Sequence, residues 1–98
     1  MPTQSRDQAI VAILAEKIGD IGDRAEYDDE GNLFVLNLNR LNLSQLPVEL
    51  GQLINLQELD LHSNQLSQLP AELGRLTNLQ TLDLYDNQLS ELPSNWAS

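Results

Sequence analysis

A phrase of twelve residues occurs three times in this chain, at intervals of 23 residues. It reads LNLNRLNLSQLP at 36–47, LDLHSNQLSQLP at 59–70 and LDLYDNQLSELP at 82–93. Leucines hold the same places in every copy, and a proline ends each copy. A unit this short cannot bury its own leucines, so neighbouring units must stack to share a core. The repeat therefore restricts the chain to a stack of small, similar units.

The hydrophobic period changes within each copy. Residues 59–62, LDLH, alternate apolar and polar side chains, which is typical of a short strand with one buried face. Residues 63–65, SNQ, indicate a turn, and Pro70 disfavours helix for the residue before it. AELGRL at 71–76 suits a single helical or 3₁₀ turn. Each unit is expected to form a strand, a bend and a return segment, with successive strands in a parallel sheet.

Asparagines follow the second and third strands of the repeat. Where the chain bends out of a strand, buried backbone groups lose their partners, and leaving them unpaired is costly. A side-chain amide offers two donors and an acceptor, so Asn64 and Asn87 are expected to bind such groups in their own and adjoining turns. Leu41 holds this position in the first copy, so the asparagine series begins one unit later.

The pattern LxxLxLxxNxLxxLPxxLGxL resembles that of the leucine-rich repeat (LRR) family, in its short intracellular type. The resemblance covers residues 33–93. It implies an α/β repeat solenoid: a curved arc with short parallel strands on the concave face and helical, 3₁₀ or irregular return segments behind them. Three repeats are expected, at 33–55, 56–78 and 79–98.

A helix is expected over residues 5–18. Ser5 and Gln8 match a capping box, and Gly19 or Gly22 supplies a stop. The apolar residues recur at helical spacing and would cover the first repeat: Ile10, Ile13, Leu14, Ile18 and Ile21. A helix lying on a membrane surface is the alternative, but the few charged residues of this segment do not form a basic face.

A β-hairpin is expected over residues 25–38, running into the first repeat, with its turn at DEGN, 29–32. It is similar to the hairpin that opens many LRR domains. Residues 1–32 would then form an N-terminal cap of helix plus hairpin, and residues 33–98 the repeats.

The acids of this hairpin also permit a calcium loop. Glu26, Asp28 and Glu30 alternate before Gly31, as ligands do in an EF-hand. The twelfth position of such a loop would be Asn37, within a strand, where an EF-hand needs glutamate. A solvated turn is therefore the favoured interpretation.

Charge and cysteine content exclude several classes of function. The chain of 98 residues has 15 acidic and 5 basic residues and a net charge of −10. This charge repels phosphate backbones and anionic lipid, so neither nucleic acid nor membrane is an expected partner. No cysteine is present, which excludes disulfides and thiolate catalysis and, with the repeat type, predicts a cytoplasmic protein. The longest apolar run, 9–15, is too short to span a bilayer and makes a poor signal peptide.

The resemblance implies that variable side chains of the concave strand face bind another protein. Tyrosine and arginine are favoured interface anchors, and the acids suit a partner with a basic surface. The predicted contact residues are Asn37, Asn39, Arg40, Glu58, Asp60, His62, Thr81, Asp83, Tyr85 and Asp86. The alternative is that they are solvated spacers between leucines. The expected function is a non-catalytic scaffold, as in signalling, without a cofactor.

His62 is the side chain that most invites a chemical role. A metal would need further ligands, and the chain has one histidine and no cysteine, so Asp60 and Asp83 could complete only a weak, exposed site. Catalysis would need a nucleophile and a cleft. Ser63 is adjacent in sequence, but neighbours on a strand point to opposite faces, although Ser63 lies at the strand's exit, and the sheet is shallow. The sequence thus predicts no catalytic residue and no metal site.

A self-assembling structural unit is the alternative function. Trp96 aligns with Leu50 and Leu73, and no polar capping helix follows it. Either Trp96 folds over the last turn, or the strand edge at 81–86 is open to another copy and forms a homo-oligomer. A third interpretation is that the chain is a repeat fragment of a larger gene product.

Overall fold

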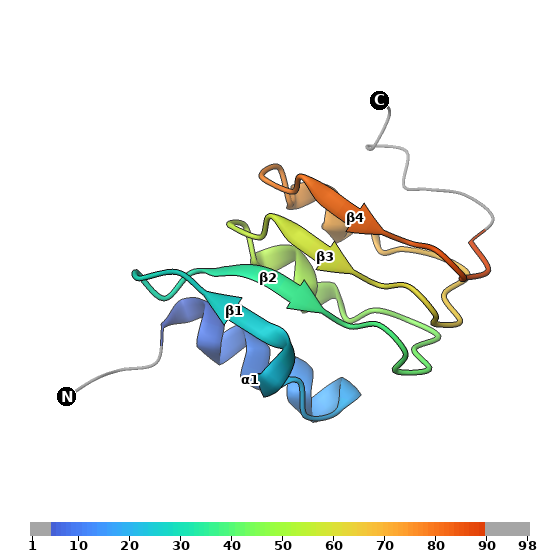
Figure 1. Ribbon diagram of the computed structural model, residues 1–98, viewed down its shortest axis with the longest axis horizontal. Coiled ribbons are helices and arrows are strands. Elements are labelled where there is room, and N and C mark those ends of the chain that lie inside the picture. The colour runs from blue at the N-terminus through green and yellow to red at the C-terminus, as the bar shows by residue number, and fades with distance from the viewer. Residues whose placement is uncertain (1–4, 90–98) are drawn as a thin grey trace.

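The structure, a computed structural model, describes residues 5–89, and Trp96 lies outside them. These residues form one α-helix, four strands and three 3₁₀ turns, shown in Figure 1. In chain order they are α1 (Arg6–Ile18), η1 (Gly22–Arg24), β1 (Ala25–Tyr27), β2 (Leu33–Asn37), η2 (Val48–Gln52), β3 (Glu58–Asp60), η3 (Ala71–Arg75) and β4 (Thr81–Asp83). Within residues 5–89, no helix has the length and apolar character needed to cross a membrane.

The four strands form one sheet in the order β1-β2-β3-β4. β1 pairs antiparallel with β2 as a hairpin, whereas β2, β3 and β4 pair in parallel. The return segments η2 and η3 are 3₁₀ turns, each following a proline, and they lie behind the sheet in Figure 1. The expected combination of short parallel strands with 3₁₀ return segments is confirmed.

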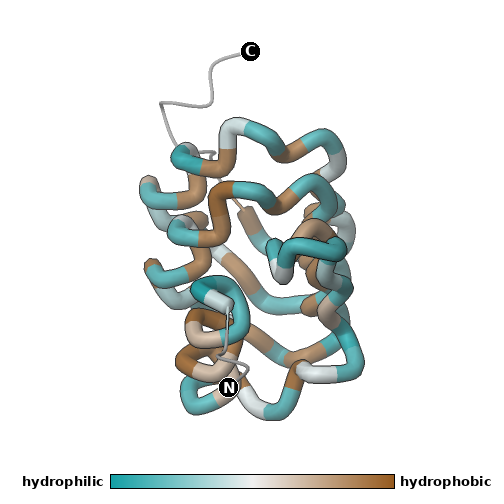
Figure 2. Tube along the Cα trace, turned by 90° about the vertical axis from the view of Figure 1, so that its left-hand side faces the viewer, coloured by the Kyte–Doolittle hydropathy of each residue, from teal (hydrophilic) through white to brown (hydrophobic). Residues whose placement is uncertain are grey.

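The leucines fill the space between the sheet and the return segments. Figure 2 shows hydrophobic and hydrophilic residues alternating along the stacked coils. The fully buried leucines are Leu14, Leu33, Leu36, Leu38, Leu50, Leu53, Leu56, Leu59, Leu61, Leu66 and Leu73. In the third copy, Leu79, Leu82, Leu84 and Leu89 are only partly buried, because β4 is the last strand of the described sheet.

Helix α1 begins with the capping box expected from the sequence. The backbone amide of Gln8 donates to Ser5 Oγ, and the amide of Ser5 donates to Gln8 Oε1. Gly19 ends the helix with φ of 104°, a conformation that glycine adopts without strain. The buried residues Ile10, Val11 and Leu14 join the leucine core.

The prediction that Ile13 belongs to the buried side of α1 is wrong. Ile13 is 40% exposed, while Val11 is buried in its place. At about 100° per residue, Leu14 falls between Ile10 and Val11 on one side of the helix, whereas Ile13 falls about 60° outside that sector.

Two hydrogen bonds tie the start of α1 to the hairpin. Ser5 Oγ donates to the carbonyl oxygen of Gly31 at 2.8 Å, and buried Asp7 Oδ2 accepts from the amide of Leu33 at 2.7 Å. Burial, and then the nearby charge of Asp7, raises the pKa of Tyr27. The helix is therefore fixed to the segment that leads into β2.

In the hairpin turn, the carboxylate of Asp28 accepts hydrogen bonds from the residues that follow it. Asp28 Oδ1 accepts from the amides of Glu30 and Asn32, and Oδ2 accepts from the side chain of Asn32. The amide of Asn32, followed by that of Glu30, holds the pKa of Asp28 below its ordinary value. Asp28, Asp29 and Glu30 are all exposed, so the turn lies at the surface.

Replacing Asp7 with alanine is expected to lower the free energy of unfolding by about 2 kcal/mol, because the buried amide of Leu33 loses a charged acceptor. Asp7→Asn keeps an acceptor and should lose clearly less. Urea denaturation of both variants measures the difference. Equal losses would contradict the role given to this hydrogen bond.

Candidate protein-binding face

One hydrogen bond recurs at the end of each parallel strand. The Oδ1 atoms of Asn37, Asp60 and Asp83 each accept from the backbone amide two residues later, all at 3.0 Å. The strand register places these three residues side by side. Their shared role is to satisfy the second amide beyond the strand, whereas the first amides after β2 and β3, those of Leu38 and Leu61, still donate to the next strand.

The remaining columns align as the sequence indicates. Val35, Glu58 and Thr81 are register partners, and the main chain continues the pairing past the strand ends, where Arg40 N donates to His62 O and Ser63 N to Tyr85 O. We call the polar side chains on this side of the sheet the strand face. It comprises Asn37, Asn39, Glu58, Asp60, His62, Thr81, Asp83 and Tyr85.

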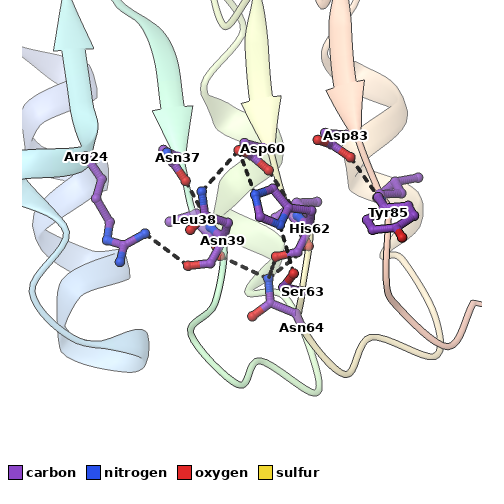
Figure 3. A network of polar contacts seen from close by, with 12 residues as sticks. Arg24, Asn37, Leu38, Asn39, Asp60, His62, Ser63, Asn64, Asp83 and Tyr85 are labelled. Atoms are coloured by element: carbon purple, nitrogen blue, oxygen red, sulfur yellow. Dashed lines mark hydrogen bonds and ion pairs between the residues drawn. The ribbon is translucent and has the colours of Figure 1, made fainter.

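Direct contacts join the middle of the strand face, as Figure 3 shows. Asn39 Nδ2 donates to Asp60 Oδ2 at 3.1 Å. His62 Nε2 lies 3.6 Å from the same oxygen, with the two side chains 23% and 31% exposed. Asp83 ends the neighbouring strand β4, and Tyr85 follows two residues beyond it and is 78% exposed. The structure thus gathers Asn39, Asp60 and His62, and places the phenol at the margin.

The turn beyond each strand has a left-handed backbone. Arg40, Ser63 and Asp86 have φ of 57°, 60° and 59°. Arg40 and Asp86, two of the predicted contact residues, therefore lie on exposed turns after the strands. In the same conformation Ser63 brings its Oγ to 2.9 Å from His62 Nδ1. The expectation that Ser63 and His62 point to opposite faces is wrong, because a left-handed residue does not continue the strand alternation.

The asparagines serve the fold below this face. Asn64 Oδ1 accepts from the amides of Leu41 and Leu43, and its Nδ2 donates to the carbonyl oxygens of Leu38, Leu61 and His62. Asn87 repeats the arrangement with Leu61, Leu66, Leu84 and Tyr85. The expected binding within the own and adjoining turns is confirmed for both.

The hairpin contributes side chains that the sequence analysis missed. Arg24 donates to the carbonyl oxygen of Asn39 at 3.0 Å, and Glu26 is the register partner of Val35. With Asp23, Asn37 and Asn39 they line a shallow depression of about 430 Å³. The antiparallel pairing of 25–38 was the available signal, because a hairpin strand extends the sheet and therefore its face.

A second depression, of about 210 Å³, lies over β2, β3 and β4. Glu58, Asp60, Thr81 and Asp83 contribute to its lining. His62 lines neither depression. The imidazole is partly exposed rather than enclosed in a cleft, and the geometry suits contact with a partner's surface better than enclosure of a small substrate.

Repeated strand–turn–3₁₀ units, one parallel sheet and asparagines bonded to successive turns define a leucine-rich repeat architecture. Residues 54–96 match the family model described as leucine-rich repeats in two copies, so the prediction of leucine-rich repeats is confirmed. Repeats of this family typically mediate protein–protein interaction and are generally not enzymes. No curated protein matches the chain.

Among solved structures, the chain is similar to an LRR protein of Leptospira interrogans, with 29% identity and a TM-score of 0.38. The alignment covers 97% of this chain and 26% of that protein, so the chain spans about a quarter of its length.

Proposed function

We propose that the chain binds another protein through the strand face and acts as a non-catalytic scaffold in the cytoplasm. The proposal rests on two negative charges, those of Asp60 and Asp83, that the hydrogen bond at the end of each strand does not need. Asn37 fills the strand-end position with a neutral amide, whereas Asp60 and Asp83 fill it with carboxylates, although the same Oδ1 bond is made in all three. The strand-end bond needs only the acceptor, so we infer that the two negative charges serve recognition, although Asp60 also accepts from Asn39 Nδ2 through its second oxygen.

These charges cost stability in the isolated chain. Asp60 and Asp83 are register partners on adjacent strands, and like charges in that arrangement repel each other. A partner's lysine or arginine side chain placed between them would relieve the repulsion and gain charge-assisted hydrogen bonds. The preferred partner surface is therefore basic.

Tyr85 supplies the apolar part of the proposed contact. It is 78% exposed beside Asp83, and an exposed tyrosine offers both a large ring and a hydroxyl to a partner. The face has few strands, so we expect a small interface and a transient complex.

A triple variant tests the proposal: Glu58→Gln, Asp83→Asn and Tyr85→Ala. Asparagine at 83 keeps the strand-end acceptor, so the fold should persist. We expect recovery of a co-purifying partner from the native host to fall at least about tenfold, since truncation of a hot-spot anchor costs about 2 kcal/mol or more and 1.4 kcal/mol is tenfold.

The matched control removes two acids and one exposed apolar side chain elsewhere: Glu16→Gln, Asp29→Asn and Val48→Ala. All three positions are exposed and lie off the strand face. This control should recover the partner as well as the natural chain does. Equal recovery by both triple variants would contradict binding through the strand face.

Self-association is the second candidate function. β4 is the outer strand of the described sheet, and the leucines beneath it are only partly buried. A second copy could pair along residues 81–86 and cover them. Trp96 belongs to this proposal from its sequence position alone. Light scattering at high micromolar concentration tests it: a dimeric mass that Thr81→Lys abolishes would support self-association, and a monomeric mass would contradict it.

A further inference from the structure

We propose that Asp60, His62 and Asp83 form a binding site for a late first-row divalent cation such as Zn²⁺. Each residue offers one ligand atom, and these atoms all lie within 4.8 Å of one another. One imidazole and two carboxylates make a donor set that zinc and its neighbours accept. The inference goes beyond protein binding, since it concerns a cation held by the chain itself.

The spacing of the donors fits shared coordination. His62 Nε2 and Asp60 Oδ2 are 3.6 Å apart, which is too long for a hydrogen bond. Two ligands that bind one tetrahedral zinc at about 2.0–2.1 Å are themselves separated by about 3.3 Å. The pair is therefore within a few tenths of an ångström of the separation that a metal would impose. The Asp83 carboxylate lies within 4.8 Å of the other two donors and would have to move closer to complete the set.

Hydrogen bonds already orient each ligand. The Oδ1 atoms of both aspartates accept backbone amides, and Asp60 Oδ2, which faces the imidazole, also accepts from Asn39 Nδ2 at 3.1 Å, so a metal would share this oxygen with the amide or displace it. Ser63 Oγ engages His62 Nδ1 at 2.9 Å. A proton on Nδ1, donated to Ser63, leaves the Nε2 lone pair for a metal, and outer-shell partners of this kind commonly fix metal-bound histidines.

A cation bound here would stabilise the isolated chain, because it would neutralise the repulsion between Asp60 and Asp83. The carboxylates on β3 and β4 repel each other, and a divalent ion between them would cancel that repulsion and cross-link the two strands. Three protein ligands leave a fourth position for water or for a group from a partner.

The chain's single histidine makes a direct test possible. The full chain is titrated with zinc chloride alone while the imidazole resonances of His62 are followed by NMR and the heat by calorimetry. We expect one zinc per chain, with Nε2 shifting most. Magnesium and calcium, which prefer oxygen ligands alone, should leave the imidazole resonances in place.

Three variants make the titration specific. His62→Gln and Asp83→Asn should each weaken zinc binding at least about tenfold. Glu26→Gln removes the same charge from β1, two strands away from β3, and should bind zinc as the natural chain does. The melting temperature of each metal-free variant verifies that it folds, and Asp83→Asn retains the acceptor for Tyr85 N.

Two results would overturn the proposal. One is an imidazole spectrum unchanged by millimolar zinc. The other is equal weakening by Glu26→Gln and Asp83→Asn, which would indicate diffuse attraction to an acidic chain. Since no partner is present in the titration, either result leaves protein binding through the strand face untouched.

Discussion

Replacing Asn64 with alanine is expected to lower the free energy of unfolding by about 3–5 kcal/mol. The side chain is 7% exposed and satisfies backbone groups of two successive turns at once. Alanine would leave two amides and at least two carbonyl oxygens without this partner, most of them buried, where water cannot easily replace it. Chemical denaturation of the natural and variant chains measures the loss.

Two further variants calibrate this result. Gln65→Ala changes the exposed next residue and should alter stability by less than about 0.5 kcal/mol. Asn87→Ala should fall between the two, because Asn87 has a similar set of bonds but is only partly buried. A loss below about 1 kcal/mol for Asn64→Ala would show that the asparagine is not what holds the turns together.

Replacing Gly51 with alanine is expected to cost about 3 kcal/mol. A Cβ at this position would overlap the carbonyl oxygen of Glu72 and lie 2.9 Å from its carbonyl carbon. These are backbone atoms of η3, so no side-chain rotation can relieve the clash. The two return segments would have to separate, and the leucines packed beneath them would lose contact.

Gly22→Ala is the matched control for this substitution. Its Cβ would meet only Asp20 Oδ1, at 3.4 Å, which is an ordinary contact. We expect a change within about 0.5 kcal/mol, measured by thermal or urea unfolding. If the two alanine variants unfold at the same midpoint, the close approach of η2 and η3 does not constrain the stack.

The sequence was sufficient for those features that repeat every 23 residues. Leu36, Leu59 and Leu82 recur at one position of the unit, so their alignment follows from the spacing alone. The role of Asn64 as a partner for backbone groups was predictable, because a buried bend leaves such groups unpaired whichever side chains surround it. The sequence also shows that glycine recurs at 51 and 74, one repeat apart. It does not show that the backbone of Glu72 lies too close to Gly51 for a Cβ, which only the structure reveals.

The site was harder to predict because it depends on where the repeats deviate from strand geometry. Ser63 reaches His62 through a left-handed residue, and no strand pattern specifies that conformation for serine. The strand-end role of Asp60 and Asp83 also emerges only when Asn37 is seen making the same bond. Arg24 was missed because the hairpin was treated as a cap, although its pairing extends the face by one strand.

The central claim is that the strand face recognises a protein with charges that the fold does not require. Quantitative recovery of the co-purifying partner by the natural chain, compared with the chain carrying Glu58→Gln, Asp83→Asn and Tyr85→Ala, tests it most directly. We expect at least about a tenfold loss of the partner, with a melting temperature no lower than that of the natural chain, because Asp83→Asn keeps the strand-end acceptor and removes a charge that repels Asp60. Full recovery of the partner by this folded variant would contradict it.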